Sequence, residues 1–68
     1  MIEIVSDTDG VQFAGNDIEY FIDDKNDIGE VYLDGNLVFQ SDNIYNENDL
    51  QGRFRESFTI IKEEQING

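Results

Sequence analysis

Apolar and polar residues alternate in five short stretches within the first 39 residues, and this period of two limits the possible folds most strongly. Alternation of this kind is typical of strands with one buried face, and the Gly, Asn and Asp residues between the stretches are typical of turns. The sequence therefore predicts four to five short antiparallel strands. Their apolar positions are Ile2 and Ile4; Val11 and Phe13; Ile18, Tyr20 and Ile22; Val31 and Leu33; Leu37 and Phe39.

The connection LDGNL, residues 33–37, can form two different hairpins. A two-residue turn at 34–35 divides the apolar residues between both faces of the sheet. A three-residue loop that ends at Asn36 keeps them on one face and pairs Val31 with Phe39. We predict the three-residue loop, with Asn36 near the left-handed region of backbone conformation.

The segment from Leu50 to Gly68 fits two structures. On a helical wheel of about 100° per residue, four apolar residues fall within an arc of about 80°, which favours an amphipathic helix. They are Leu50, Phe54, Phe58 and Ile61. Asn48 or Asp49 is available as the N-cap and Gly68 as the stop. We therefore predict an α+β fold, a small antiparallel sheet of four to five strands with one C-terminal helix packed on it.

An all-β fold, with the C-terminal segment as a further strand, is the alternative. Phe54, Phe58 and Ile60 also alternate with polar residues, and Gly52 interrupts the helical pattern.

The charge is strongly negative and unevenly distributed. The chain has 16 acidic and 4 basic residues in 68, for a formal net charge of −12. Residues 1–52 carry all of this excess, whereas residues 53–68 are neutral. A chain of this length forms one domain, so we predict a single acidic domain over residues 1–68.

Strand alternation predicts where the acids point. If Ile18, Tyr20 and Ile22 face the core, then Asp17, Glu19, Phe21 and Asp23 face outward. Exposed aromatic residues within a polar rim are typical of a protein interface, although a second small core would also account for Phe21 and Tyr32. Val38 and Gln12 are expected on the same outward face. The candidate partner-binding residues are Glu3, Asp17, Glu19, Phe21, Asp23, Asp24, Asp27, Glu30, Tyr32 and Asp34.

No motif for catalysis or metal binding is found. The chain contains no cysteine, which removes thiolate metal sites, and no histidine, which removes the commonest metal ligand and general base. The stretches at 7–10 and 24–30 have some features of calcium loops but lack the ligand pattern of an EF-hand. We therefore expect no enzyme activity, no catalytic residues, no cofactor and no metal site. Direct binding of nucleic acid is excluded by the sign of the charge.

The charge pattern suggests a basic protein as the partner. A rigid display of carboxylates can imitate a phosphate backbone and occupy the basic site of a nucleic-acid-binding protein, such as a nuclease, a restriction enzyme or a CRISPR effector. In charge and size the chain resembles small, cysteine-free acidic inhibitors that bacteriophages encode, including uracil-DNA glycosylase inhibitor and anti-restriction and anti-CRISPR proteins. That resemblance implies an anti-defence role as a DNA mimic.

Two alternatives remain open. One is an acidic interaction module, such as an immunity protein, an antitoxin or an assembly subunit, that is anchored by exposed aromatic residues. The other is an acidic surface that serves only solubility or adaptation to high salt.

The N-terminal sequence MIEIVSDTDG has neither a basic region nor an apolar run. We therefore expect a cytoplasmic protein, in the host cytoplasm if a phage encodes it, with no membrane contact. A monomer or a weak homodimer is expected.

Overall fold

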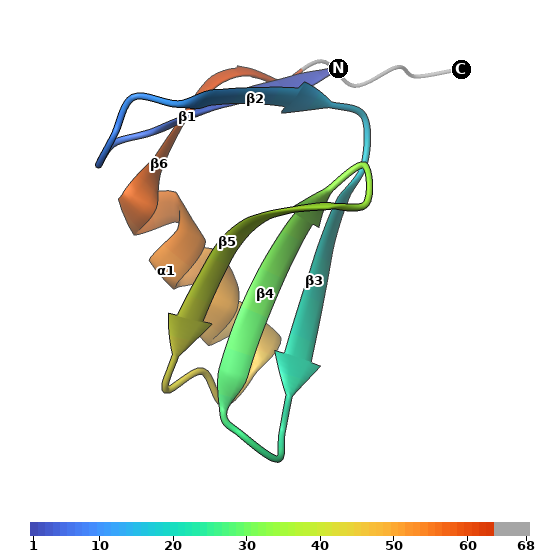
Figure 1. Ribbon diagram of the computed structural model, residues 1–68, viewed down its shortest axis with the longest axis vertical. Helices are drawn as coiled ribbons and strands as arrows, with labels where there is room; N and C mark the ends of the chain where they lie inside the picture. Colours follow the sequence, from blue (N-terminus) through green and yellow to red (C-terminus); the bar gives the residue numbers. More distant parts are fainter. Residues whose placement is uncertain (64–68) are drawn as a thin grey trace.

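The computed structural model describes residues 1–63, which form six strands and one helix (Figure 1). Strands β2, β1 and β6 form a first antiparallel sheet in that order, and β3, β4 and β5 form a second. The elements in chain order are β1 (Ile2–Ser6), β2 (Gln12–Gly15), β3 (Ile18–Asp23), β4 (Ile28–Leu33), β5 (Asn36–Asp42), α1 (Glu47–Ser57) and β6 (Phe58–Glu63).

The predicted α+β class is confirmed, but the single sheet of four to five strands is not. After the helix, β6 pairs with the other edge of β1, so β2, β1 and β6 form a sheet that is separate from β3, β4 and β5 (Figure 1). The all-β alternative is wrong for residues 47–57, which are helical, and right for residues 58–63, which form a strand.

The N-cap of the helix lies two residues before the earlier of the two predicted caps. The Asn46 side chain accepts a hydrogen bond from the backbone amide of Asp49 at 2.9 Å. Asn46 is therefore the N-cap, and the prediction of Asn48 or Asp49 is wrong. The predicted stop, Gly68, lies outside the described residues.

The helix also ends earlier than the wheel suggests. Phe58 has an extended backbone and its amide donates to the carbonyl of Phe54, which closes the last turn. From there the buried positions follow a period of two, so Phe58 is buried, Ile60 is half-buried and Ile61 is exposed. The predicted helical placement of Phe58 and Ile61 is therefore wrong, while Leu50 and Phe54 are buried on α1 as expected.

The hairpin between β4 and β5 has a two-residue turn. Asp34 and Gly35 have φ values of 51° and 80°, as a type I′ turn requires, and the prediction of a three-residue loop is wrong. Val31 nevertheless pairs with Phe39, as predicted, because a β-bulge between Val31 and Tyr32 shifts the register of β5 by one residue. The bulge restores the alternation that the short turn alone would have reversed.

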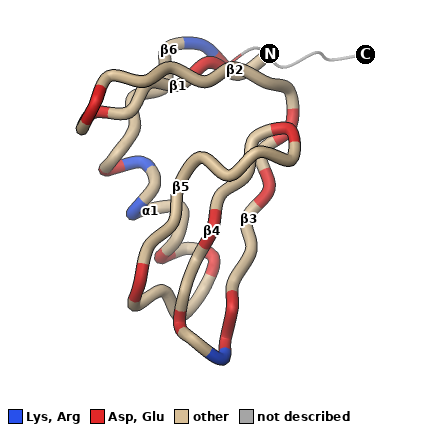
Figure 2. The backbone as a smooth tube through the Cα atoms, viewed as in Figure 1, with Lys and Arg blue, Asp and Glu red and all other residues tan. Residues whose placement is uncertain are grey.

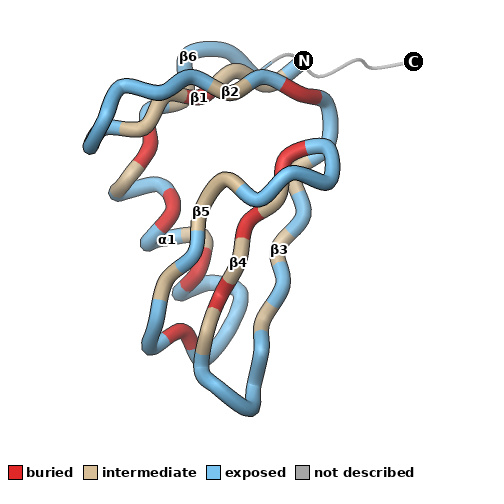
Figure 3. The backbone as a smooth tube through the Cα atoms, viewed as in Figure 1, coloured by how far each residue is buried: buried red, intermediate tan, exposed pale blue. Residues whose placement is uncertain are grey.

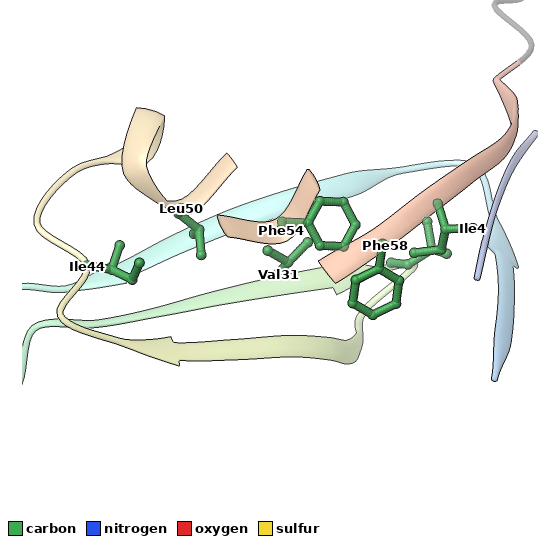
Figure 4. Packing of buried hydrophobic residues seen from close by; sticks show 7 residues of the cluster. Ile4, Val31, Ile44, Leu50, Phe54 and Phe58 are labelled. Carbon is green, nitrogen blue, oxygen red and sulfur yellow. The ribbon is translucent and has the colours of Figure 1, made fainter. Parts of the chain in front are cut away.

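The core lies between the helix and the two sheets (Figures 3 and 4). Helix α1 contacts β3, β4 and β5 on one face of the second sheet and also contacts β6. Phe58 connects the two sheets, because its ring lies 6.2 Å from that of Phe13 in β2 and 6.0 Å from that of Phe39 in β5. The buried core residues are Ile4, Val31, Leu33, Ile44, Leu50, Phe54 and Phe58.

Gly29 of β4 lies directly beneath side chains of α1 and of the segment that precedes it. A Cβ atom on Gly29 would lie 2.7 Å from Leu50 Cδ1 and 2.8 Å from Ile44 Cγ2. The missing side chain therefore allows the helix to sit directly on the second sheet. Within residues 1–63, α1 covers one face of this sheet, and the opposite face carries exposed side chains such as Phe21 and Leu37.

Candidate partner-binding face

The uncovered face of the second sheet is built by the alternation of three strands, and we call it the outer face. Cross-strand pairing fixes its members, because directly paired residues lie on the same side of a sheet. Glu19 pairs with Tyr32, Phe21 with Glu30 and Asp23 with Ile28. On the other side of β4, Tyr32 pairs with Leu37, Glu30 with Gln40 and Ile28 with Asp42 of β5. The complete set is Glu19, Phe21, Asp23, Ile28, Glu30, Tyr32, Leu37, Gln40 and Asp42.

An aromatic pair occupies this face. The rings of Phe21 and Tyr32 lie 5.3 Å apart between centroids, with an interplanar angle of 87°. Phe21 is 49% exposed and Tyr32 is half-buried, and neither belongs to the core cluster. A second core beneath a loop or the helix, the alternative explanation for these aromatics, is therefore not what the structure has.

The aromatic pair and neighbouring acids line an open hollow of about 460 Å³. Its volume lies within the range of roughly 300–1,000 Å³ that is usual for ligand sites. The lining residues are Glu19, Phe21, Ile22, Asp23, Glu30, Tyr32 and Gly35. Five of the ten residues predicted for partner binding thus surround one depression.

Glu30 is the central acid of the outer face. It lies directly opposite Phe21 in the β3–β4 ladder, and Glu19 and Asp23 occupy its two diagonal positions. Diagonal neighbours in a sheet are typically about 7–8 Å apart, so these three carboxylates repel one another. The amide of Gln40, opposite Glu30 on β5, donates to the Glu30 carboxylate at 3.5 Å, a long hydrogen bond.

Asp23 is the last residue of β3, and Asp24 and Asp27 lie in the turn between β3 and β4, at the end of the outer face (Figure 2). The Asp23 carboxylate accepts bonds from the Asn26 side chain at 2.8 Å and from the Lys25 backbone amide at 3.0 Å. These bonds, chiefly the one from Asn26, lower the pKa of Asp23 below its usual value. Asp23 therefore both shapes the turn and contributes charge to the outer face.

Asp34 has a structural role that the sequence reasoning missed. Its carboxylate accepts hydrogen bonds from the backbone amides of Asn16, at 3.1 Å, and Asp17, at 3.0 Å. The Asp34 amide in turn donates to the Asp17 carbonyl at 2.9 Å. Asp34 and Asp17 thus fasten the corner where the chain passes from the first sheet to the second. They lie beside the outer face, with the Asp34 carboxylate directed at backbone amides.

Glu3 does not join the other candidates. It lies on β1, where it pairs with Ala14 and Lys62 in the first sheet, and Gln12 lies in the same sheet on β2. Val38 is also not on the outer face, because it lies in the bulge region and packs against the core, while Leu37 is exposed in its place. The Asp-Gly dipeptide, a typical signal for a two-residue turn, could have indicated this change of face for Leu37.

The two stretches with features of calcium loops form turns at residues 7–9 and 24–27, and residues 28–30 of the second stretch belong to β4. In the first, Asp9 accepts a bond from the Val11 amide at 3.1 Å, and Asp7 accepts one from the Thr59 hydroxyl at 2.6 Å. Within residues 1–63 no group of three or more His, Cys, Asp or Glu side chains could hold a metal ion. Over the same residues no helix is long and apolar enough to cross a bilayer.

Comparisons of the chain with protein-family models, with curated proteins and with solved structures found no match.

Proposed function

We propose that this protein binds a basic protein through the outer face and acts there as a mimic of a nucleic acid. The observation that carries the proposal is a sheet face on which Glu19, Asp23, Glu30 and Asp42 project together while α1 covers the opposite face. Asp24 and Asp27 extend the same negative surface into the adjoining turn (Figure 2). A rigid surface of this kind attracts positively charged grooves over long distances.

The target in this proposal is a protein that normally holds DNA or RNA, such as a nuclease, a restriction enzyme or a CRISPR effector. Strand geometry supports the mimicry, because residues on one face of a strand recur every ~6.7 Å. A carboxylate array on three neighbouring strands therefore presents closely spaced negative charges, as a phosphate backbone does. The role is inhibitory binding without catalysis, and it is compatible with a phage-encoded protein directed against host defence.

The exposed Phe21–Tyr32 pair favours a second candidate, an acidic interaction module anchored by aromatic residues. In such interfaces a few aromatic side chains supply most of the binding energy, while charges mainly set the association rate. An immunity protein, an antitoxin or an assembly subunit could bind in this way. The two candidates differ in how affinity is distributed between the acids and the two rings.

Affinity capture from a nuclease-treated bacterial lysate tests the proposal, with the tagged full chain as bait. The test variant is Glu19→Gln/Glu30→Gln, and the matched control is Glu56→Gln/Glu63→Gln, which removes the same charge from α1 and β6. A mimic should retain nucleic-acid-binding proteins that are released by salt and by added DNA. The test variant should lose them and the control should keep them.

Other outcomes have clear meanings. A partner that resists salt and is lost on Phe21→Ala, but not on charge removal, would support the aromatic-anchored module. Equal capture by the wild type and the Glu19→Gln/Glu30→Gln variant would refute any role of the outer-face charge.

A further inference from the structure

The geometry of the aromatic pair leaves flat ring surface uncovered. In an edge-to-face pair, the ring that presents its edge keeps both of its faces free of the other ring. The angle of 87° between Phe21 and Tyr32 is of this type, and Phe21 is 49% exposed. The hollow of about 460 Å³ next to these rings leaves room for a side chain from another molecule.

Carboxylates stand on both sides of these rings. Glu19 is the direct cross-strand partner of Tyr32, and Glu30 is the direct partner of Phe21. All four residues line the same hollow. The electron-rich ring faces and the two carboxylates favour the same kind of ligand group, a cation.

The chain has no cation of its own on the outer face. All four basic residues lie in the described part of the chain, and each is elsewhere (Figure 2). Arg53 and Arg55 are on α1, across the sheet from the outer face, and Lys62 is on β6 of the first sheet. Lys25 lies in the turn at the end of the face.

We propose that the hollow is a binding site for an arginine side chain of the partner. The guanidinium stacks on the exposed aromatic surface and its N–H groups donate to the carboxylate of Glu30 or Glu19. Arginine suits this site better than lysine, because its planar group can stack and bind a carboxylate with two hydrogen bonds at once. The inference rests on the proposed function, since it specifies which residue of a basic partner enters the outer face.

The test is an NMR titration of the ¹⁵N-labelled full chain with three blocked peptides of the form Gly-X-Gly. X is arginine, lysine or citrulline, and citrulline keeps the planar shape of arginine without its charge. The arginine peptide should shift the backbone amides of Phe21, Glu30 and Tyr32. It should bind about three- to fivefold more tightly than the lysine peptide, and the citrulline peptide should cause no saturable shift.

Three single substitutions test where on the protein the arginine peptide binds. Phe21→Ala and Glu30→Gln should each weaken binding of the arginine peptide by threefold or more, whereas Glu56→Gln on α1 should leave it unchanged. Phe21 is exposed and lies outside the core, so the Phe21→Ala spectrum should remain that of a folded protein.

The arginine site is refuted if arginine and lysine peptides bind equally, if the shifts lie elsewhere, or if Phe21→Ala has no effect. These results are separate from a failure of the proposed function. If a captured partner still depends on Glu19 and Glu30 while the peptides show no arginine preference, only the arginine site is wrong. If neither partner nor peptide depends on these acids, both proposals are wrong.

Discussion

Glu30→Gln should make the protein more stable while weakening its binding to a basic partner. The substitution keeps the size of the side chain and an oxygen that can accept the hydrogen bond from Gln40. It removes the charge that Glu19 and Asp23 face from their diagonal positions. The native fold should therefore lose a repulsion that the unfolded chain largely lacks.

The size of the effect follows from the sheet geometry. At the usual diagonal separation of about 7.5 Å, two carboxylates in water repel by about 0.5 kcal/mol. At 0.15 M salt, where the Debye length is about 8 Å, screening reduces the repulsion between Glu19 and Glu30 to about 0.2 kcal/mol. Asp23 adds a repulsion of the same sign. At low salt, where screening is weak, the repulsion stays near 0.5 kcal/mol. For a domain of this size, removing 0.5 kcal/mol of repulsion corresponds to a Tm increase of about 2–4 °C.

Thermal unfolding followed by circular dichroism, at about 10 mM and 500 mM salt, measures the change in Tm that Glu30→Gln causes. The Tm of Glu30→Gln should exceed that of the wild type by 2 °C or more at low salt, and the difference should shrink at high salt. Glu56→Gln is the control, because Glu56 lies on α1 with Arg53 and Arg55, so its removal should relieve less repulsion than the removal of the Glu30 charge. A lower Tm for Glu30→Gln, or a difference that does not change with salt, would refute the argument.

Three further substitutions test the turn, the corner and the helix contact. Asp34→Ala should lower the free energy of unfolding by about 1–2 kcal/mol in urea titrations, because two backbone amides at the β2–β3 corner lose their acceptor. Asp34→Asn keeps an acceptor oxygen and tolerates the positive φ, so an equally large loss would contradict this role. The lowered pKa of Asp23 stabilises the fold above about pH 4, and this contribution is lost as the pH falls through the folded-state value. Tm should hold or rise between pH 7 and pH 5 and fall below pH 4, and the fall should be smaller in Asp23→Asn; an unchanged profile in that variant would exclude Asp23 as a cause. Gly29→Ala should destabilise the fold by about 1–3 kcal/mol, since its methyl group would meet Leu50 and Ile44. A neutral result in chemical denaturation would mean that α1 shifts at little cost.

The local pattern of the sequence predicts most of the strands and the orientation of β3. Ile18, Tyr20 and Ile22 contact the core, and Glu19 and Phe21 point away from it, as strict alternation requires. This works because β3 is regular, so a period of two applies along its whole length. The acidic and aromatic character of the outer face could be predicted for the same reason.

The local sequence pattern does not predict which strands pair or where a β-bulge interrupts a strand. Alternation identifies strands but does not say which strands pair, so the separation into two sheets, and with it the position of Glu3, was not predictable. The two-residue turn places Leu37 on the outer face, and the β5 bulge returns Phe39 to the core side through one additional residue, Val38, which no period reveals. The role of Asp34 depends on backbone amides 17 and 18 residues away, which become its neighbours only after folding.

The division into two sheets also bears on the order in which the protein folds. The second sheet consists of two consecutive hairpins, so its pairings close short loops and can form early. The first sheet needs β6 to find β1 across ~50 residues, which costs more chain entropy before any contact is gained. We therefore expect the outer face to be assembled in the transition state for folding, with high φ-values in β3 and β4. The β1–β6 pairing should form later, with φ-values near zero in β6.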